Sequence, residues 1–85
     1  MRKELEERLI DYSVLVFELS NKIDKQFFGN YLINQLLRSS ASAALNYGEA
    51  QSAESKKDFI HKIGVVLKEL RESDVNLKII LKANI

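Results

Sequence analysis

The polar side chains best placed to form a functional site in this sequence lie in one stripe near its middle. Arg38, Ser42, Asn46 and Glu49 follow at intervals of 4, 4 and 3 residues, so on an α-helix they share one face. Such a stripe could bind a ligand or nucleic acid. It could also form a buried polar network that fixes helix register or a subunit interface, because buried charges need partners. Arg38 and Glu49 are three turns apart, so each needs a partner from another helix or chain; we favour the structural interpretation.

Other patterns that carry catalysis or metal binding are missing from the sequence. His61 is the only histidine and there is no cysteine, which excludes disulfides, zinc–thiolate sites and thiol catalysis. The serines lie in no Gly-x-Ser-x-Gly elbow, and the isolated glycines form no phosphate-binding loop. We therefore predict that the protein is not an enzyme, with no catalytic residue, cofactor, metal or small-molecule substrate.

The basic residues are concentrated toward the end of the chain. The whole protein has a net charge of +1, too small for a global attraction to nucleic acid or a membrane. Residues 56–82 nevertheless hold seven basic and four acidic side chains. A solvated helix face is the simple explanation, and RNA or DNA binding is the alternative. The candidate nucleic-acid contacts are Lys56, Lys57, Lys62, Lys68 and Arg71.

Apolar spacing predicts three helices, over residues 3–21, 30–51 and 54–82. The first and third carry apolar residues at alternating intervals of 4 and 3, the pattern of a helix that packs along one face. The sequence contains no proline, which favours long helices. Strand patterns are absent. We predict one all-α domain over residues 1–85, an up-and-down antiparallel helical bundle.

Two connections separate the predicted helices. The first spans residues 21–29 and includes Asp24, a residue type that suits turns, together with Phe27 and Phe28, which we expect to anchor this corner on the core. The second spans residues 52–55, where either Ser52 or the Ser55–Asp58 pair could cap the third helix.

The second helix is small or apolar around most of its circumference. Residues 39–44 read Ser-Ser-Ala-Ser-Ala-Ala, which permits close approach of a neighbour. Such a helix is expected to be buried by more than one other helix. The tyrosines and phenylalanines lie mostly at core spacing, so we predict that they are buried and find no aromatic platform beside basic residues.

Two segments resemble a known family. Residues 35–50 contain Gln35, Leu36, Arg38, Ser42, Asn46 and Glu49 at the spacing of the signature helix of the 23S ribosomal RNA intervening-sequence proteins. Residues 53–62 and 67–73 are similar to the family's third helix. The similarity covers residues 5–82. It departs from the family pattern at Ala44, where proline is frequent, and at Ala50, where glycine is frequent.

The resemblance implies a bacterial, cytoplasmic four-helix bundle that assembles into a homo-oligomer, typically a pentamer. Members of the family that this chain resembles are encoded within ribosomal RNA genes. In this chain the fourth helix would be short or absent, which leaves an apolar face open for interaction. A related branch is an accessory of reverse transcriptase in diversity-generating retroelements and binds nucleic acid through a basic surface. No residue pattern predicts a membrane partner, because no stretch approaches the ~18 apolar residues of a span.

Overall fold

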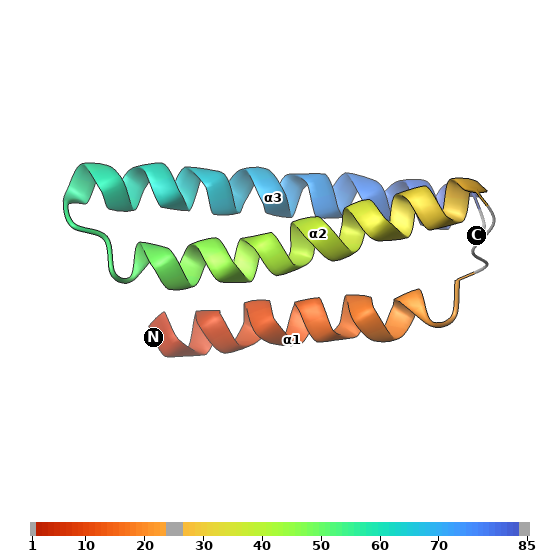
Figure 1. Ribbon diagram of the computed structural model, residues 1–85, viewed down its shortest axis with the longest axis horizontal. Coiled ribbons are helices and arrows are strands. Elements are labelled where there is room, and N and C mark those ends of the chain that lie inside the picture. The colour runs from red at the N-terminus through yellow and green to blue at the C-terminus, as the bar shows by residue number, and fades with distance from the viewer. Residues whose placement is uncertain (1, 24–26, 84–85) are drawn as a thin grey trace.

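Three long helices make up the part of the chain that the structure describes. The computed structural model describes residues 2–23 and 27–83. Within these ranges the chain forms α1 (Arg2–Ser20), α2 (Phe27–Ala50) and α3 (Lys56–Ala83), without strands. The helices run antiparallel, up, down and up (Figure 1). The predicted all-α antiparallel bundle is confirmed, and these residues include no fourth helix.

The helix boundaries agree with the sequence prediction to within two residues, except at the start of α2. This helix begins at Phe27, three residues earlier than predicted, because no proline prevents the extension. Phe28 therefore lies in the first turn and is 50% exposed, so the prediction that it anchors the corner is wrong. The side chain of Phe27 and all of Asp24 lie outside the described residues.

A capping interaction fixes the start of α3. The Ser55 hydroxyl oxygen accepts a 3.0 Å hydrogen bond from the Asp58 backbone N–H. The Asp58 carboxylate in turn accepts from the Glu54 backbone N–H at 3.3 Å. These bonds satisfy amide groups that have no partner inside the helix. Of the two predicted caps, the structure forms the Ser55–Asp58 pair.

Helix α2 occupies the centre of the arrangement. It packs against α1 on one side and against α3 on the other, which confirms the prediction of more than one neighbour. The molecule extends 44 Å along its longest axis, close to the ~42 Å expected for the 28 residues of α3 at 1.5 Å per residue. The length of the molecule therefore equals the length of its longest helix, because the helices lie side by side.

The core consists of two apolar clusters with a layer of serine between them. One cluster contains Val16, Ile23, Leu32, Ile33, Leu36 and Ile80, and the other contains Leu9, Ala43, Tyr47 and Val66. Ser39, Ser40 and Ser73 are fully buried between these two levels of α2 and α3. Small side chains at this level let the two helices approach closely.

Candidate functional site

The Arg38 guanidinium of α2 reaches across to two carboxylates of α3. One of its nitrogens donates to Glu69 at 3.2 and 3.3 Å, and the other donates to Glu72. Glu69 and Glu72 are three residues apart, so the α-helix places both on the face that meets α2. The partner that Arg38 requires is thus supplied by another helix of the same chain.

Two further members of the polar stripe extend this network along α2. The Ser42 hydroxyl donates to Glu69 at 3.1 Å. The Asn46 amide nitrogen donates to the Ser42 hydroxyl at 3.1 Å and to the Ser42 carbonyl at 2.8 Å. Glu49 is exposed and has no side-chain hydrogen bond or ion pair to the described residues. The network therefore joins Arg38, Ser42 and Asn46 but leaves Glu49 apart.

The charges of this network are unequally exposed. The Arg38 side chain is 50% exposed and that of Glu72 is 43% exposed, whereas that of Glu69 is only 11% exposed. The hydrogen bond from Arg38 lowers the pKa of Glu72 below its usual value, and the same bond raises the pKa of Arg38. Glu69 is the member that depends most on its partners, because a buried carboxylate without them would be costly.

The candidate basic residues of α3 do not all face the same way. Lys57, Lys68 and Arg71 are exposed and share the outward face of the helix, since they are separated by 11 and 3 residues. Lys62 is turned away from this face and pairs with Asp58 at 3.0 Å. Lys56, although exposed, lies about a quarter turn to the side of it.

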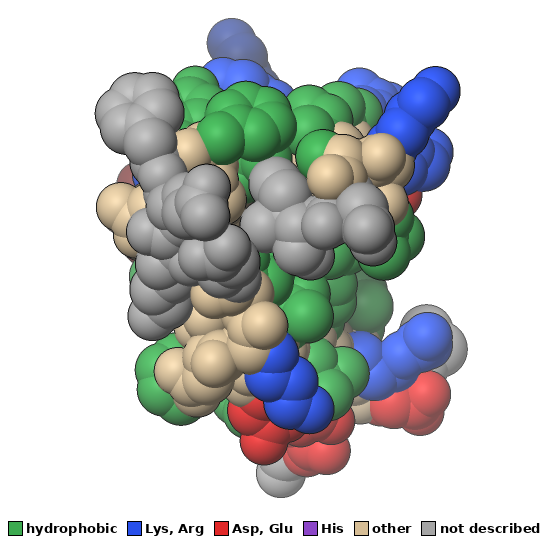
Figure 2. Space-filling model, turned by 90° about the vertical axis from the view of Figure 1, so that its right-hand side faces the viewer, with side chains coloured by type: hydrophobic (Ala, Val, Ile, Leu, Met, Phe, Trp, Pro, Cys, Tyr) green, Lys and Arg blue, Asp and Glu red, His purple; other side chains and the backbone are tan. Residues whose placement is uncertain are grey.

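Two additional lysines extend the same outward face. Lys78 and Lys82 continue the alternating spacing and are exposed, as is His61 near the start of the helix. We call this surface the α3 basic stripe, made up of Lys57, His61, Lys68, Arg71, Lys78 and Lys82. Figure 2 shows basic side chains along the top of the molecule, the side on which α3 lies in Figure 1. Heptad spacing applied to the outer face, as well as to the core face, would have identified Lys78 and Lys82.

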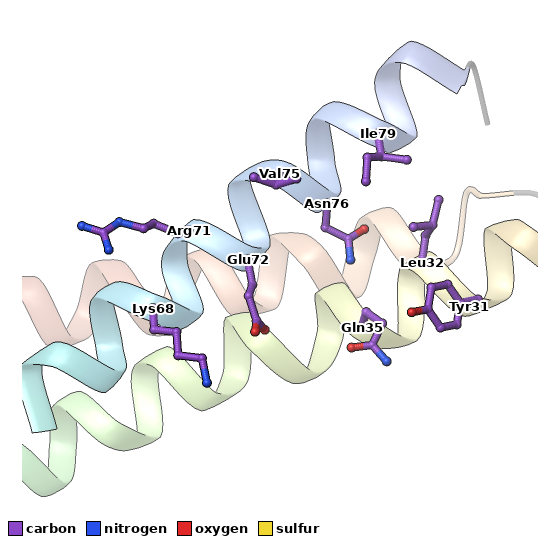
Figure 3. Close-up of a pocket in the computed structure, with 9 residues that line it drawn as sticks. All are labelled: Tyr31, Leu32, Gln35, Lys68, Arg71, Glu72, Val75, Asn76 and Ile79. Atoms are coloured by element: carbon purple, nitrogen blue, oxygen red, sulfur yellow. The ribbon is translucent and has the colours of Figure 1, made fainter.

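A groove of about 560 Å³ runs beside this stripe, between α2 and α3. Figure 3 shows Lys68, Glu72 and Asn76 pointing from α3 toward α2, while Arg71 extends away. Gln35 and Tyr31 of α2 lie near Asn76, at the other end of the lining from Lys68. Leu32, Val75 and Ile79 supply the apolar part of its lining. The residues of α2 and α3 that line it are far apart in the sequence, so spacing within one helix could not reveal the groove.

The aromatic side chains are less buried than predicted. Tyr47 is buried at 7% exposure, but Tyr31 is 55% exposed, and Phe17 and Phe59 are 59% and 41% exposed. Their spacing along each helix is that of a packing face, yet a three-helix arrangement leaves sides of each helix without a neighbour. Tyr31 and Lys68 line the same groove, but Figure 3 shows them at opposite ends of its lining.

The described residues form neither a cluster of metal ligands nor a membrane-spanning helix. No group of three or more potential metal ligands comes together there. None of the three helices, over the residues described, combines the length and apolarity required for a membrane crossing.

Comparison with known proteins identifies the family. The profile of the 23S rRNA-intervening sequence protein family matches residues 4–85, nearly the whole chain. No curated protein and no solved structure matches. The match includes the α2 stripe and the α3 segments on which the resemblance was based. This chain therefore belongs to the 23S rRNA-intervening sequence protein family.

Proposed function

We propose that this protein is a non-catalytic assembly module that binds further copies of itself through the open side of its bundle. The observation that carries the proposal is a groove between α1 and α3, lined by Leu5, Arg8, Leu9, Tyr12, Leu70, Asp74 and Leu77. In an up-and-down bundle a fourth helix covers this position. A helix from a second copy would provide the same burial.

Exposed leucine and isoleucine side chains widen this groove on both edges. Ile60, Leu67 and Leu81 occupy the same heptad position as Asp74 and are 59%, 48% and 77% exposed. On α1, Leu15 occupies the position of Arg8 and is 62% exposed. Several exposed apolar side chains along one groove are typical of an interaction site. Burial of such side chains contributes roughly 25 cal/mol per Å² of apolar area removed from water.

The expected assembly is a closed homo-oligomer of about five cytoplasmic subunits, as the family resemblance implies. Sedimentation equilibrium over a range of concentrations gives the mass directly. Leu67→Glu should lower the mass, because it places a charge in the groove surface. Leu45→Glu alters an exposed leucine on α2, outside this groove. This variant should keep the mass of the wild-type oligomer.

Two results would contradict this proposal. A wild-type chain that is monomeric at micromolar concentration would exclude self-assembly. If Leu45→Glu lowered the mass and Leu67→Glu did not, the contact between subunits would lie on the outer face of α2 and not at the α1–α3 groove.

The α3 basic stripe supports a second candidate function, nucleic-acid binding. Its residues are all exposed, with Lys78 paired to Asp74 at 2.9 Å and Glu72 bordering the stripe beside Lys68. Oligomerisation would multiply the stripe into a larger positive surface, and phosphate contacts give affinity without sequence preference. The near-neutral net charge makes the local stripe the source of attraction.

Salt dependence tests this second function. If the stripe contacts phosphates, the logarithm of the binding constant should fall with the logarithm of salt concentration, with a slope of roughly −0.7 to −0.9 per contact. Replacing Lys57, Lys68 and Arg71 by glutamine should reduce that slope. Lys62→Gln is the matched control, because Lys62 pairs with Asp58. Absence of binding at low salt would exclude this function.

A further inference from the structure

We propose that the groove between α2 and α3 holds an unpaired nucleobase of a single-stranded nucleic acid. In this arrangement the base stacks on Tyr31, its edge meets the amides of Gln35 and Asn76, and a neighbouring phosphate contacts Lys68. The proposal rests on the second candidate function, nucleic-acid binding, and adds which form of nucleic acid is bound and where.

Tyr31 supplies the stacking surface. More than half of this side chain is exposed, although its ring is large and apolar. It lies at the end of the groove that Leu32 and Ile79 also line (Figure 3). A base covering the ring would remove apolar surface from water, and stacking on an aromatic side chain contributes about 1–3 kcal/mol per base.

The side-chain amides supply complementary polar groups. Gln35 projects from α2 and Asn76 from α3 into the same groove. An amide both donates and accepts hydrogen bonds, as does the edge of a nucleobase. The Asn76 Oδ1 atom is buried and has no hydrogen-bond partner within the described part of the chain. Since buried polar atoms are normally satisfied, this acceptor would gain a partner if the Asn76 amide turned toward a bound base.

The charge in the groove suits a phosphate on the side facing the α3 basic stripe. Lys68 points into the groove and belongs to the stripe. The acidic residue of the lining, Glu72, accepts a hydrogen bond from Arg38 and forms an ion pair with it. This pairing offsets the repulsion that a free carboxylate would exert on a phosphate. The Arg38 network thus acts on the groove indirectly, by neutralising its acid.

The recessed shape favours single strands over duplexes. In a duplex the bases are stacked and paired, so their faces are not available to Tyr31. The groove also lies between two helices, and no described element projects from it to enter a duplex groove. An unpaired base can instead turn out of its strand and enter. Phosphates on either side would then follow the stripe along α3.

The test compares one labelled RNA of about ten nucleotides, single-stranded or annealed to its complement, by fluorescence anisotropy at low salt. The full chain should bind the single strand more tightly than the duplex. Tyr31→Ala should weaken single-strand binding about 5- to 150-fold, the stacking contribution converted to a ratio of Kd values, and Tyr31→Phe should retain most of the affinity. Asn76→Leu should weaken it less. Phe28→Ala is the control, because Phe28 is an equally exposed aromatic one turn earlier on α2 and outside the groove.

The possible failures are distinguishable from one another. If neither RNA form binds, nucleic-acid binding itself is wrong and the groove proposal falls with it. If both forms bind equally and Tyr31→Ala has no effect, the stripe binds phosphates but the groove does not hold a base. Each variant is also examined by sedimentation. A loss of mass in Tyr31→Ala would identify the groove as a contact between subunits and overturn the proposal.

Discussion

The two helix–helix seams of this bundle are held together by different forces. Side chains of α2 and α3 are joined by the Arg38–Glu69 and Arg38–Glu72 pairs and by hydrogen bonds from Ser42 and between Ser39 and Ser73. Between α1 and α2, the described side chains form no hydrogen bond or ion pair, and the contact is apolar.

Apolar burial holds two helices together, whereas the polar bonds also fix their axial position relative to each other. Burial of apolar side chains is non-directional and favours any arrangement that excludes water. Hydrogen bonds with fixed geometry favour one axial position, and a buried group that loses its partner is costly. We therefore expect α2 and α3 to behave as one hairpin with a defined register. We expect α1 to be the helix that detaches first.

Truncation of the α1 seam should have the largest effect. Leu9 is 6% exposed and packs in the cluster with Tyr47 and Val66, so Leu9→Ala should destabilise the protein by about 2–5 kcal/mol. Urea unfolding measures this loss. Hydrogen exchange should show faster opening of α1 than of the α2–α3 hairpin. Val14→Ala, at a 49% exposed position of the same helix outside the α1–α3 groove, should change stability little. Equal acceleration in all three helices would contradict the distinction between the seams.

Removal of the buried serine pair should have the next largest effect. The Ser39 and Ser73 hydroxyls share a 2.8 Å hydrogen bond inside the core. Ser39→Ala leaves the Ser73 hydroxyl buried without this partner and should cost about 1–3 kcal/mol. The double alanine variant should cost less than the sum of the single variants, which a double-mutant cycle in urea would reveal.

Ser40→Ala provides the control for that cycle. Ser40 is also fully buried, but among the described residues its hydroxyl bonds only to the Leu37 carbonyl of its own helix. It should show little coupling to Ser73→Ala. Strict additivity of Ser39→Ala and Ser73→Ala would mean that the bond does not link the two helices energetically.

Loss of the Arg38 guanidinium should have a smaller effect. Arg38→Met removes the ion pairs from Glu69 and Glu72. It should cost about 1 kcal/mol, because half of the Arg38 side chain is exposed, solvent screens the pair, and Ser42 still donates to the buried Glu69. Arg38→Lys should recover part of this loss, since it restores charge without the two-pronged geometry. Lys78→Met breaks an exposed pair with Asp74 within α3 and should cost only a few tenths of a kcal/mol. Thermal unfolding of the three variants ranks them, and an equal loss from Lys78→Met would remove the special role of Arg38.

Acidification should have the smallest effect on the same seam. The hydrogen bond from Arg38 lowers the pKa of Glu72 from its usual 4.5. A lowered folded-state pKa gives stability that is present above pH 4.5 and is lost as the pH falls through the folded value. The free energy of unfolding should therefore decline below about pH 4.5, and less steeply in Arg38→Met. The same decline in both proteins would show that other carboxylates cause it.

Periodicity predicted most of the fold because it reports which face of a helix is apolar. Val66, Ser73 and Ile80 follow one another at intervals of seven residues on the packing face of α3 and are buried. Periodicity does not report whether a neighbour covers that face. Phe59 lies on the same face and remains 41% exposed, because it is in the first turn of α3 at the end of the bundle, beside the α2–α3 connection.

The site was less predictable than the fold for a related reason. The residue types of the α2 stripe showed that Arg38 needed a partner. Its identity depends on the axial register between α2 and α3, which the connection and the core determine together. The pairing with Glu69 and the meeting of Tyr31 with Asn76 both result from that register. No spacing within a single helix contains this information.

The capped connection between α2 and α3 also bears on the order of folding. The polar bonds across this seam join residues only 27 to 34 positions apart, so a modest loop closure brings them together. Contacts that are near in sequence generally form early and allow fast folding. We expect the hairpin to provide the folding nucleus, although α1 leaves the ribosome first. The apolar face of the newly made α1 would then stay exposed until the α2–α3 hairpin has formed and α1 can pack against it.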